Sequence, residues 1–285
     1  MEQGPVIVIG AGGAVGFEAV RALRARNMNV IATWRTHRPE TIAALEGFGA
    51  TTQQLDLKDG EAVRRLIENA AAVLFIPILT ASAAAARYLK LDQPAVLFSS
   101  NNVAIDFDAE VYAKLRDAEK ETRTAAPHAV ILRPTMIYGY PGDGNLSRLM
   151  NFMRRSPVTP MPGKGRALQQ PVYYADLARA AVDALLDGNA IGKTFAVAGP
   201  EPVTLKDMYR TAKAAARANT AILSMPTSSA GKLMQAVEKA GVKFPLKSAQ
   251  LLRADMDKIP QGEHIILTQT GLQEGLQKLA AAMAE

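Results

Sequence analysis

Short β-branched runs alternate with longer helix-forming segments between Pro5 and Pro134, and this alternation is what most constrains the fold. Repeated strand–helix units of this kind build a parallel sheet with helices on its faces. The strand candidates are almost continuously apolar, as expected of strands covered on both sides. We therefore predict an α/β chain with a doubly wound parallel sheet, whose strands read VIVIG, NVIAT, TTQQL, AVLFI, AVLFS and AVILR.

The intervening segments predict helices, and the pattern loosens after Pro134, where many of the prolines and glycines gather in residues 138–170. That stretch predicts loop around one helix. Regular elements resume with a strand over 172–174 and continue mostly as helix, apart from a strand over 194–198. The predicted helices are 14–26, 60–69, 81–89, 109–124, 176–186, 205–217 and a closing amphipathic helix over 270–284.

The charge balance and the missing cysteines exclude several classes of function. The net charge of +6 comes from 33 basic and 27 acidic residues. Because the basic residues form no dense block, we predict no nucleic-acid partner. The chain has no cysteine, which excludes disulfides, thiolate catalysis and cysteine-bound metals and favours a reducing compartment.

No segment predicts export or membrane insertion. The opening MEQGPVIVIG lacks a signal-peptide core, because its apolar run is itself a short strand. The longest apolar run, Ala70 to Leu79, is far shorter than the roughly 20 residues of a spanning helix. We therefore expect a soluble cytoplasmic protein without a membrane partner.

A glycine-rich turn follows the first strand directly. Gly10, Gly13 and Gly16 give the spacing GxxGxxG, with Gly12 inside it, and a helical segment starts at Ala14 and Val15. Glycine permits the tight turn and a close backbone approach to pyrophosphate, while the helix end offers free N–H groups. All six residues are predicted to contact a dinucleotide. The alternative is an ordinary glycine-rich strand-to-helix turn.

The end of the second strand favours NADP(H) over NAD(H). NAD sites place a carboxylate there to bind the ribose 2′-hydroxyl, but residues 31–38 contain none. Arg35 and Arg38 stand there instead, and their planar guanidinium groups suit a 2′-phosphate. The alternative is that one or both arginines are simply solvated.

Six further segments resemble the extended and atypical short-chain dehydrogenase/reductases. They include sugar-nucleotide-epimerase-like members and members like an accessory subunit of complex I. The order of the segments matches the family over nearly the whole chain. The segments are Leu55-Asp56-Leu57, Phe75-Ile76-Pro77, Ser99-Ser100, Leu132-Arg133-Pro134 through Tyr138-Gly139, Gln170 to Ala178, and Ala198 to Glu201.

The resemblance implies a Rossmann dinucleotide-binding domain in residues 1–134, to which 170–200 return. It implies a smaller substrate lobe in 135–169 and 201–285. It also implies a small-molecule substrate and a homodimer formed through helices 81–89 and 109–124, although the sequence leaves the oligomeric state open. Seven more residues are assigned to the cofactor in this way: Asp56, Leu57, Ile76, Pro77, Ser99, Arg133 and Pro134. For Asp176, a helix N-cap is an alternative to a ligand contact.

The family's general acid/base is a tyrosine with a lysine four residues later and a serine that hydrogen-bonds the reacting oxygen. Tyr112 matches the tyrosine and Ser100, preferred over Ser99, matches the serine, but position four is Arg116. Arginine keeps a positive charge on the same helix face but cannot relay a proton. The alternative for Tyr112 is a structural tyrosine that faces the cleft. A second such spacing, Tyr209 to Lys213, is interpreted as chance.

Tyr138 and Arg166 are the substrate-lobe residues that we assign to the substrate. Lys164 and Arg166 could meet a phosphorylated substrate, or could be solvated loop charges. The three histidines show no metal-ligand spacing, so no metal site is predicted. The leading hypothesis is an NADP(H)-dependent oxidoreductase or epimerase acting on a carbonyl or secondary alcohol. The alternative is an NADP(H)-binding sensor or scaffold without catalysis.

Overall fold

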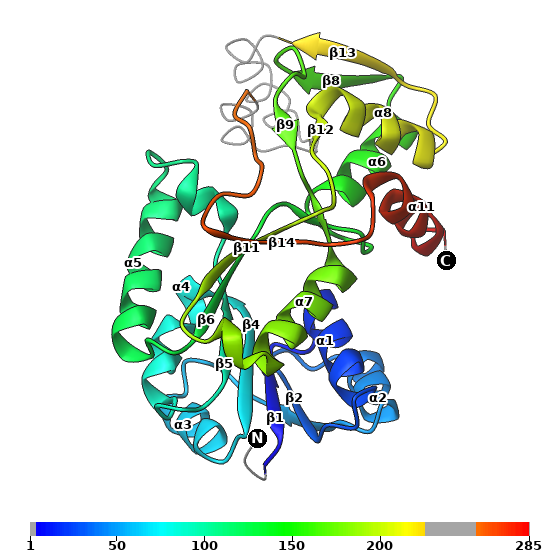
Figure 1. Ribbon diagram of the computed structural model, residues 1–285. Coiled ribbons are helices and arrows are strands. Elements are labelled where there is room, and N and C mark those ends of the chain that lie inside the picture. The colour runs from blue at the N-terminus through cyan, green and yellow to red at the C-terminus, as the bar shows by residue number, and fades with distance from the viewer. Residues whose placement is uncertain (1–3, 226–254, 285) are drawn as a thin grey trace. The chain divides into compact units, whose positions relative to one another are not determined.

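The computed structural model describes residues 4–225 and 255–284, and the chain divides into two compact units (Figure 1). Of the described residues, those within 1–134, 175–197 and 260–266 form the first unit. Those within 135–174, 198–259 and 267–285 form the second. The first stretch of the first unit ends at Pro134. The return of residues 260–266 to the first unit was not predicted.

An eight-stranded sheet runs through the first unit in the order β14-β11-β6-β5-β4-β1-β2-β3. The pairings from β3 across to β11 are parallel. The strand order reverses between β1 and β4, which is where doubly wound sheets bind ligands at the carboxyl ends of their strands. The strands are β1 (Val6–Ile9), β2 (Val30–Trp34), β3 (Thr51–Gln54), β4 (Ala72–Ile78), β5 (Ala95–Phe98), β6 (Val130–Pro134), β11 (Thr194–Ala198) and β14 (His264–Leu267).

Helices cover both faces of this sheet (Figure 1). One face packs against α3, η1 and α5 through a continuous buried core that includes Phe75, Leu97 and Leu115. The other face carries α1, α2 and α7. The bounds are α1 (Ala14–Arg24), α2 (Pro39–Gly47), α3 (Gly60–Glu68), α4 (Leu79–Ser82), η1 (Ala83–Tyr88), η2 (Asn101–Ala104), α5 (Glu110–Ala125), α7 (Tyr174–Leu186) and η3 (Gly188–Ala190).

Local sequence explains where several of these helices begin. Asp59 caps α3, because its carboxylate accepts a hydrogen bond from the N–H of Ala62 at 3.1 Å. Pro39 opens α2, where its missing N–H costs no helical hydrogen bond. On α1 the buried positions Ala19, Val20 and Leu23 recur at helical spacing and turn one apolar stripe to the sheet.

Where the structure describes it, the second unit has short paired strands and three longer helices. Three two-stranded sheets pair β10 with β7, β12 with β9, and β13 with β8. Its core includes the fully buried side chains of Tyr138, Met150 and Leu279. The elements are β7 (Ile137–Tyr138), α6 (Leu146–Arg155), β8 (Val158–Pro162), β9 (Leu168–Gln169), β10 (Val172–Tyr173), β12 (Val203–Thr204), α8 (Leu205–Ala215), β13 (Ala221–Met225) and α11 (Leu272–Ala282).

The predicted doubly wound sheet is confirmed, and three local expectations differ from the structure. The segment predicted as one helix over 81–89 is a short α-turn followed by the 3-10 helix η1. The region after residue 217 was expected to be mostly helical, but β13 and β14 are strands. Short strands depend on distant pairing partners, so their local pattern is weak. Residues 226–254 of that region lie outside the described residues.

Candidate functional site

The glycine-rich turn links the end of β1 to the start of α1. Gly10 has a φ of +83°, which L side chains rarely adopt. Its N–H donates to the hydroxyl of the buried Thr33 at 3.3 Å. A Cβ at Gly10 would also lie 3.0 Å from the Pro77 ring. The turn is thus fixed by contacts with both neighbouring strands, β2 and β4.

The first turn of α1 leaves its backbone donors available. Gly13 is the N-cap and supplies no side-chain hydrogen bond, and the first turn holds no acidic residue. A helix end of this kind attracts anions through its free N–H groups and its dipole. A Cβ on Gly16 would lie 2.5 Å from the Gly10 carbonyl oxygen, so only glycine allows the helix to pack so close to the turn.

A cavity of about 670 Å³ lies beside this turn, within the first unit. This volume suits a small-molecule ligand. Its walls come from the turn, the end of β2, the loop after β3 and the end of β4. Eight of the predicted cofactor residues line it: Gly10, Gly12, Gly13, Arg35, Arg38, Asp56, Leu57 and Pro77. The other seven lie outside the lining: Ala14, Val15, Gly16, Ile76, Ser99, Arg133 and Pro134.

The rim of the cavity at the end of β2 is cationic. Arg35 and Arg38 are both exposed and both line the cavity. In the part of the chain that the structure describes, neither guanidinium forms an ion pair. The one carboxylate of the lining, Asp56, accepts the N–H of Lys58 at 3.0 Å. Two free guanidinium groups therefore stand where an anionic group on a bound ligand would be stabilised.

The two serines at the end of β5 have different surroundings. Ser100 is partly exposed, and its hydroxyl accepts the N–H of Asn102 at 3.3 Å, which caps η2. Ser99 is 3% exposed, and its hydroxyl has no hydrogen-bond partner among the described residues. Ser100 therefore contributes to the local backbone, and Ser99 holds a buried hydroxyl next to it.

Tyr112 lies in the first turn of α5 and is linked to the same loop. Its hydroxyl accepts a hydrogen bond from the side-chain amide of Asn102 at 2.7 Å. Lys114, two residues later, pairs with Glu110 at 2.7 Å, and this contact raises the pKa of the Lys114 ammonium. Ser100, Asn102 and Tyr112 thus form one hydrogen-bonded chain, in which sequence reasoning had not included Asn102.

Arg116 braces the loop between η2 and α5. Its guanidinium donates to the carbonyl oxygens of Val103 at 3.1 Å, Asp106 at 3.3 Å and Phe107 at 3.0 Å. It also lies over the Phe107 ring, 5.2 Å from the centroid. These contacts hold the donors of the guanidinium on backbone carbonyls, so a structural role accounts for the arginine at this position.

Arg133 forms a half-buried ion pair with α5. Its Nε and Nη2 donate to the two carboxylate oxygens of Glu119 at 2.9 and 2.5 Å. The side chains are 23% and 11% exposed, respectively. Arg123 lies near the pair, and its pKa is lowered by burial and by Arg133, while Glu119 acts in the opposite direction. The contacts of Arg133 link β6 to α5. Pro134 is buried and is the last residue of β6.

Two residues assigned to the substrate lie in the second unit with different accessibility. Tyr138 is completely buried, and its hydroxyl donates to the carbonyl of Gly271 at 3.3 Å. The Tyr138 ring packs edge-on against Tyr173. These contacts place Tyr138 in the core of the second unit, and its assignment to the substrate stays a prediction. Arg166 is exposed in the loop before β9.

Several residues left open by the sequence now have a defined place. Asp176 is 4% exposed and lies inside the first turn of α7, where it pairs with Arg179. It is therefore not the N-cap. Tyr209 is 2% exposed, and burial raises the pKa of its phenol strongly, which agrees with a core residue.

Neither a metal cluster nor a membrane span is found where the structure describes the chain. No group of three histidine, aspartate or glutamate side chains gathers closely enough there to hold a metal ion. Over the same residues, every helix is too short or too polar to cross a bilayer.

Thr33 and Asn102 are two hydrogen-bonding site residues that sequence reasoning missed. Thr33 was visible as a polar residue inside an apolar strand, which signals a specific hydrogen-bond partner. Asn102 follows the Ser-Ser pair directly, but its contact with Tyr112 depends on how α5 packs against the end of β5. No sequence signal gives that contact.

Comparisons with known proteins show which proteins the chain resembles. Residues 6–106 match the model of the NAD dependent epimerase/dehydratase family. The chain is 41% identical over 83 residues to the mitochondrial "NADH dehydrogenase [ubiquinone] 1 alpha subcomplex subunit 9" of Mus musculus, covering 29% of this chain and 22% of the mouse protein. It is 27% identical over 215 residues to the same subunit of Rattus norvegicus, covering 68% and 56% of the two chains. This chain therefore spans at most 56% of the length of these curated relatives.

The fold resembles that of solved epimerases. UDP-glucuronic acid 4-epimerase from Bacillus cereus, solved with UDP-glucuronic acid and NAD, superposes with a TM-score of 0.67. The two chains share 15% identity, with 98% of this chain and 99% of the epimerase covered. Identity at this level establishes the fold alone. Taken together, the match over residues 6–106 and the shared fold confirm that the chain resembles the extended and atypical short-chain dehydrogenase/reductases.

Proposed function

We propose that the protein binds NADP(H) and acts as an oxidoreductase or epimerase on a carbonyl or secondary alcohol. The observation that carries this proposal is the cavity beside the Gly10–Gly13 turn, whose rim holds Arg35 and Arg38 and no carboxylate at the end of β2. The match to an NAD dependent family over residues 6–106 supports the dinucleotide. The two arginines favour the phosphorylated form.

The residues of this chain fit such a cofactor. The free N–H groups at the start of α1 would hold the pyrophosphate. Arg35 and Arg38 would bind the 2′-phosphate, and Asp56 and Leu57 would contact the adenine. When bound, a nicotinamide cofactor supplies or accepts a hydride. The protein's contribution is to bind this group, orient it and keep water away from it.

Tyr112 is the proposed proton donor and acceptor for the substrate oxygen. A positioned phenol can exchange a proton with a reacting oxygen, and Asn102 holds the Tyr112 oxygen through a 2.7 Å hydrogen bond. Ser99 and Ser100 supply hydroxyl groups at the adjacent strand end. A small-molecule substrate class of UDP-sugars is suggested by the epimerase that shares the fold.

Arginine replacement tests the cofactor assignment directly. Arg35→Ala and Arg38→Ala should each weaken NADPH binding by roughly 10- to 100-fold, because each removes charge-assisted hydrogen bonds to phosphate. NADH, which lacks the 2′-phosphate, should be affected little. Isothermal titration calorimetry with both cofactors measures this difference. Arg65→Ala, an exposed arginine on α3 away from the cavity, is the control. Equal loss for both cofactors would argue against a 2′-phosphate contact.

Tyr112→Phe tests the proposed proton transfer. We expect turnover to fall by about 10²- to 10⁴-fold, the usual contribution of a general acid or base, with NADPH binding unchanged. The assay follows NADPH consumption with a panel of aldehydes and ketones. With UDP-glucuronic acid and NADP⁺ it follows the epimer formed, because epimerisation returns the hydride and consumes no cofactor. Tyr88→Phe, on η1, is a matched control, because its hydroxyl accepts a hydrogen bond from the exposed Arg87 and lies outside the proposed site. Undiminished turnover in Tyr112→Phe would remove Tyr112 from the reaction.

A second function, cofactor binding without catalysis, is favoured by the contacts of Arg116. Its guanidinium is held by three backbone carbonyls, where active relatives carry a lysine. The curated relatives are named as subunits of a larger assembly. In this case the wild type should bind NADPH and turn over none of the panel. Measurable wild-type turnover would exclude it, whereas turnover only in Arg116→Lys would indicate a lapsed enzyme.

A further inference from the structure

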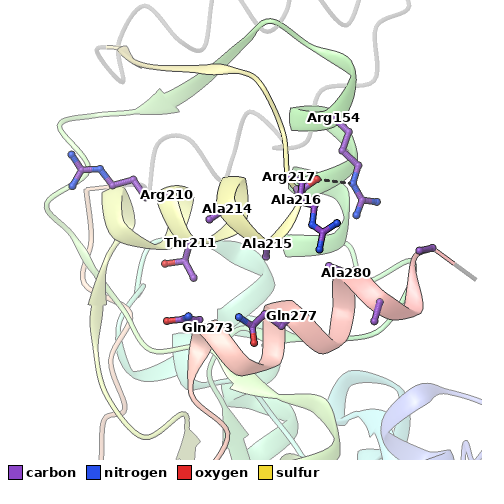
Figure 2. A pocket seen from close by; sticks show the side chains of 12 residues that line it. Arg154, Arg210, Thr211, Ala214, Ala215, Ala216, Arg217, Gln273, Gln277 and Ala280 are labelled. Atoms are coloured by element: carbon purple, nitrogen blue, oxygen red, sulfur yellow. Dashed lines mark hydrogen bonds between the residues drawn. The ribbon is translucent and has the colours of Figure 1, made fainter.

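A groove of about 840 Å³ lies in the second unit, between α8 and α11 and the end of α6. Figure 2 shows the side chains that line it, with the two helices α8 and α11 as its long walls. It is lined by Arg154, Arg210, Thr211, Ala214, Ala215, Ala216, Arg217, Gln273, Gln277, Ala280, Ala281 and Ala284. None of these residues belongs to the cofactor cavity, which lies in the first unit.

The groove is cationic at both ends. Arg210 stands at one end, and Arg154 and Arg217 stand together at the other (Figure 2). Among the described residues that line it, no side chain carries a carboxylate. Arg210 pairs with Asp207 at 3.4 Å, whereas neither Arg154 nor Arg217 forms an ion pair within residues 4–225 and 255–284. An occupant of the groove must therefore bring negative charge to this last pair.

Both arginines of that pair are held in place. The Nε of Arg154 donates to the carbonyl of Ala216 at 3.2 Å, which orients its guanidinium at the rim. Arg217 follows the last turn of α8 with a φ of +49°. The N–H of Arg217 bonds to Ala214 and that of Ala218 to Lys213, a helix ending that favours glycine at this position. An arginine thus stands where backbone geometry alone would select glycine.

The walls of the groove favour a helical occupant. The lining residues of α11 recur at helical spacing along its whole length, about 16 Å, and its opposite face is buried. Alanines on both walls let a third helix approach closely, as in ridge-into-groove packing. The backbone groups of both walls are already used within α8 and α11. An extended segment would therefore find few partners for its own N–H and C=O groups, whereas a helix satisfies them internally.

We propose that this groove docks an acidic amphipathic helix of a partner protein. Apolar side chains of that helix would cover the alanines, and its carboxylates would pair with Arg154 and Arg217. Gln273 and Gln277, whose side chains have no hydrogen-bond partner among the described residues, face the groove (Figure 2) and would fix the register. A second copy of this chain is disfavoured, because the same arginines would meet each other. Single-stranded nucleic acid is disfavoured because no aromatic side chain lines the groove for base stacking.

Binding of a synthetic helix to the full chain tests this site. The probe is a fluorescein-labelled amphipathic peptide of about 15 residues, long enough to form a helix, with alanine and leucine on one face and glutamates beside it. Fluorescence anisotropy should show saturable binding of this peptide and much weaker binding of a scrambled peptide of the same composition. Absence of binding, equal binding of the scrambled peptide, or preference for a single-stranded oligonucleotide would overturn the proposal.

Charge-reversal variants test whether the peptide binds in the groove. The double variant Arg154→Glu with Arg217→Glu should weaken the acidic peptide at least tenfold and strengthen a peptide carrying lysine in place of glutamate. The double variant Arg148→Glu with Arg155→Glu is the matched control, because it changes the net charge by the same amount and both arginines are exposed on α6 but do not line the groove. If this control weakens binding as much as the groove variant does, the effect is one of net charge and the proposed site is wrong.

Arg217→Gly separates docking from folding. Glycine adopts the left-handed backbone without strain, so this variant should raise the thermal midpoint of the chain. The same variant should weaken peptide binding several-fold, because it removes the guanidinium. If Arg217 had only a structural role, Arg217→Gly would lower the thermal midpoint and leave the peptide affinity of the folded protein unchanged. That result would contradict the assignment of Arg217 to docking.

Discussion

Gly16→Ala is expected to destabilise the protein by roughly 3 kcal/mol and to abolish dinucleotide binding. The added methyl carbon would lie 2.5 Å from the Gly10 carbonyl oxygen and 2.8 Å from the Ala11 Cα. Both neighbours are backbone atoms, so α1 must move away from the turn. Urea denaturation measures the loss of stability, and calorimetric titration with NADPH measures the loss of binding.

Gly13→Ala is the matched control for this prediction. The nearest atom to a Cβ at Gly13 is the Gly10 carbonyl oxygen at 3.8 Å, an ordinary contact. The variant should keep its stability but lose affinity for the cofactor, since the methyl group would stand where the phosphate approaches the start of α1. If Gly16→Ala kept wild-type stability, the close packing of α1 against the turn would be wrong. If Gly13→Ala kept full NADPH affinity, the proposed phosphate position would be wrong.

Arg133→Ala is expected to cost about 3 kcal/mol of folding free energy. The variant leaves Glu119, whose side chain is 11% exposed, without its bidentate partner. Arg123 remains nearby, but its donors already bind the carbonyls of Ala129 and Lys193. Urea denaturation of Arg133→Ala and of Glu119→Ala gives the two single losses.

A double-mutant cycle separates this pair from general packing. In the variant with both Arg133→Met and Glu119→Leu, apolar side chains replace both charges, and such replacements are often close to neutral. We therefore expect the double variant to be clearly more stable than the summed losses of Arg133→Met and Glu119→Leu, each measured alone, imply. Strict additivity of the two single substitutions would show that the pair contributes no mutual stabilisation.

The sequence predicted the elements that local patterns determine. The strands β1, β2, β4, β5 and β6 stand where apolar runs predicted them, the polar β3 stands at the predicted TTQQL, and Thr194 to Ala198 form β11 as expected. The glycine turn and the arginines after β2 were found because each depends on residues adjacent along the chain. Eight of the predicted cofactor residues line one cavity for this reason.

Contacts between distant residues were beyond the sequence. The role of Arg116 could not be predicted from its spacing after Tyr112. The carbonyl groups that it binds belong to the loop from Val103 to Phe107, and no local sequence pattern gives the path of that loop. Tyr138 was assigned to the substrate from its place after Arg133-Pro134, but packing against Tyr173 and Gly275 buries it. The strand β14 exists only through pairing with β11, which no local pattern encodes.

The interleaved path of the chain has a consequence for synthesis on the ribosome. The first stretch of the first unit ends with β6 at Pro134, but the neighbour of β6, β11, begins only at Thr194, and β14 begins at His264. A nascent chain that has emerged to Pro134 therefore presents β6 as an open sheet edge with unpaired backbone groups, a template for wrong pairing. The first unit cannot be completed before most of the second has been translated, so the two units mature together rather than one after the other.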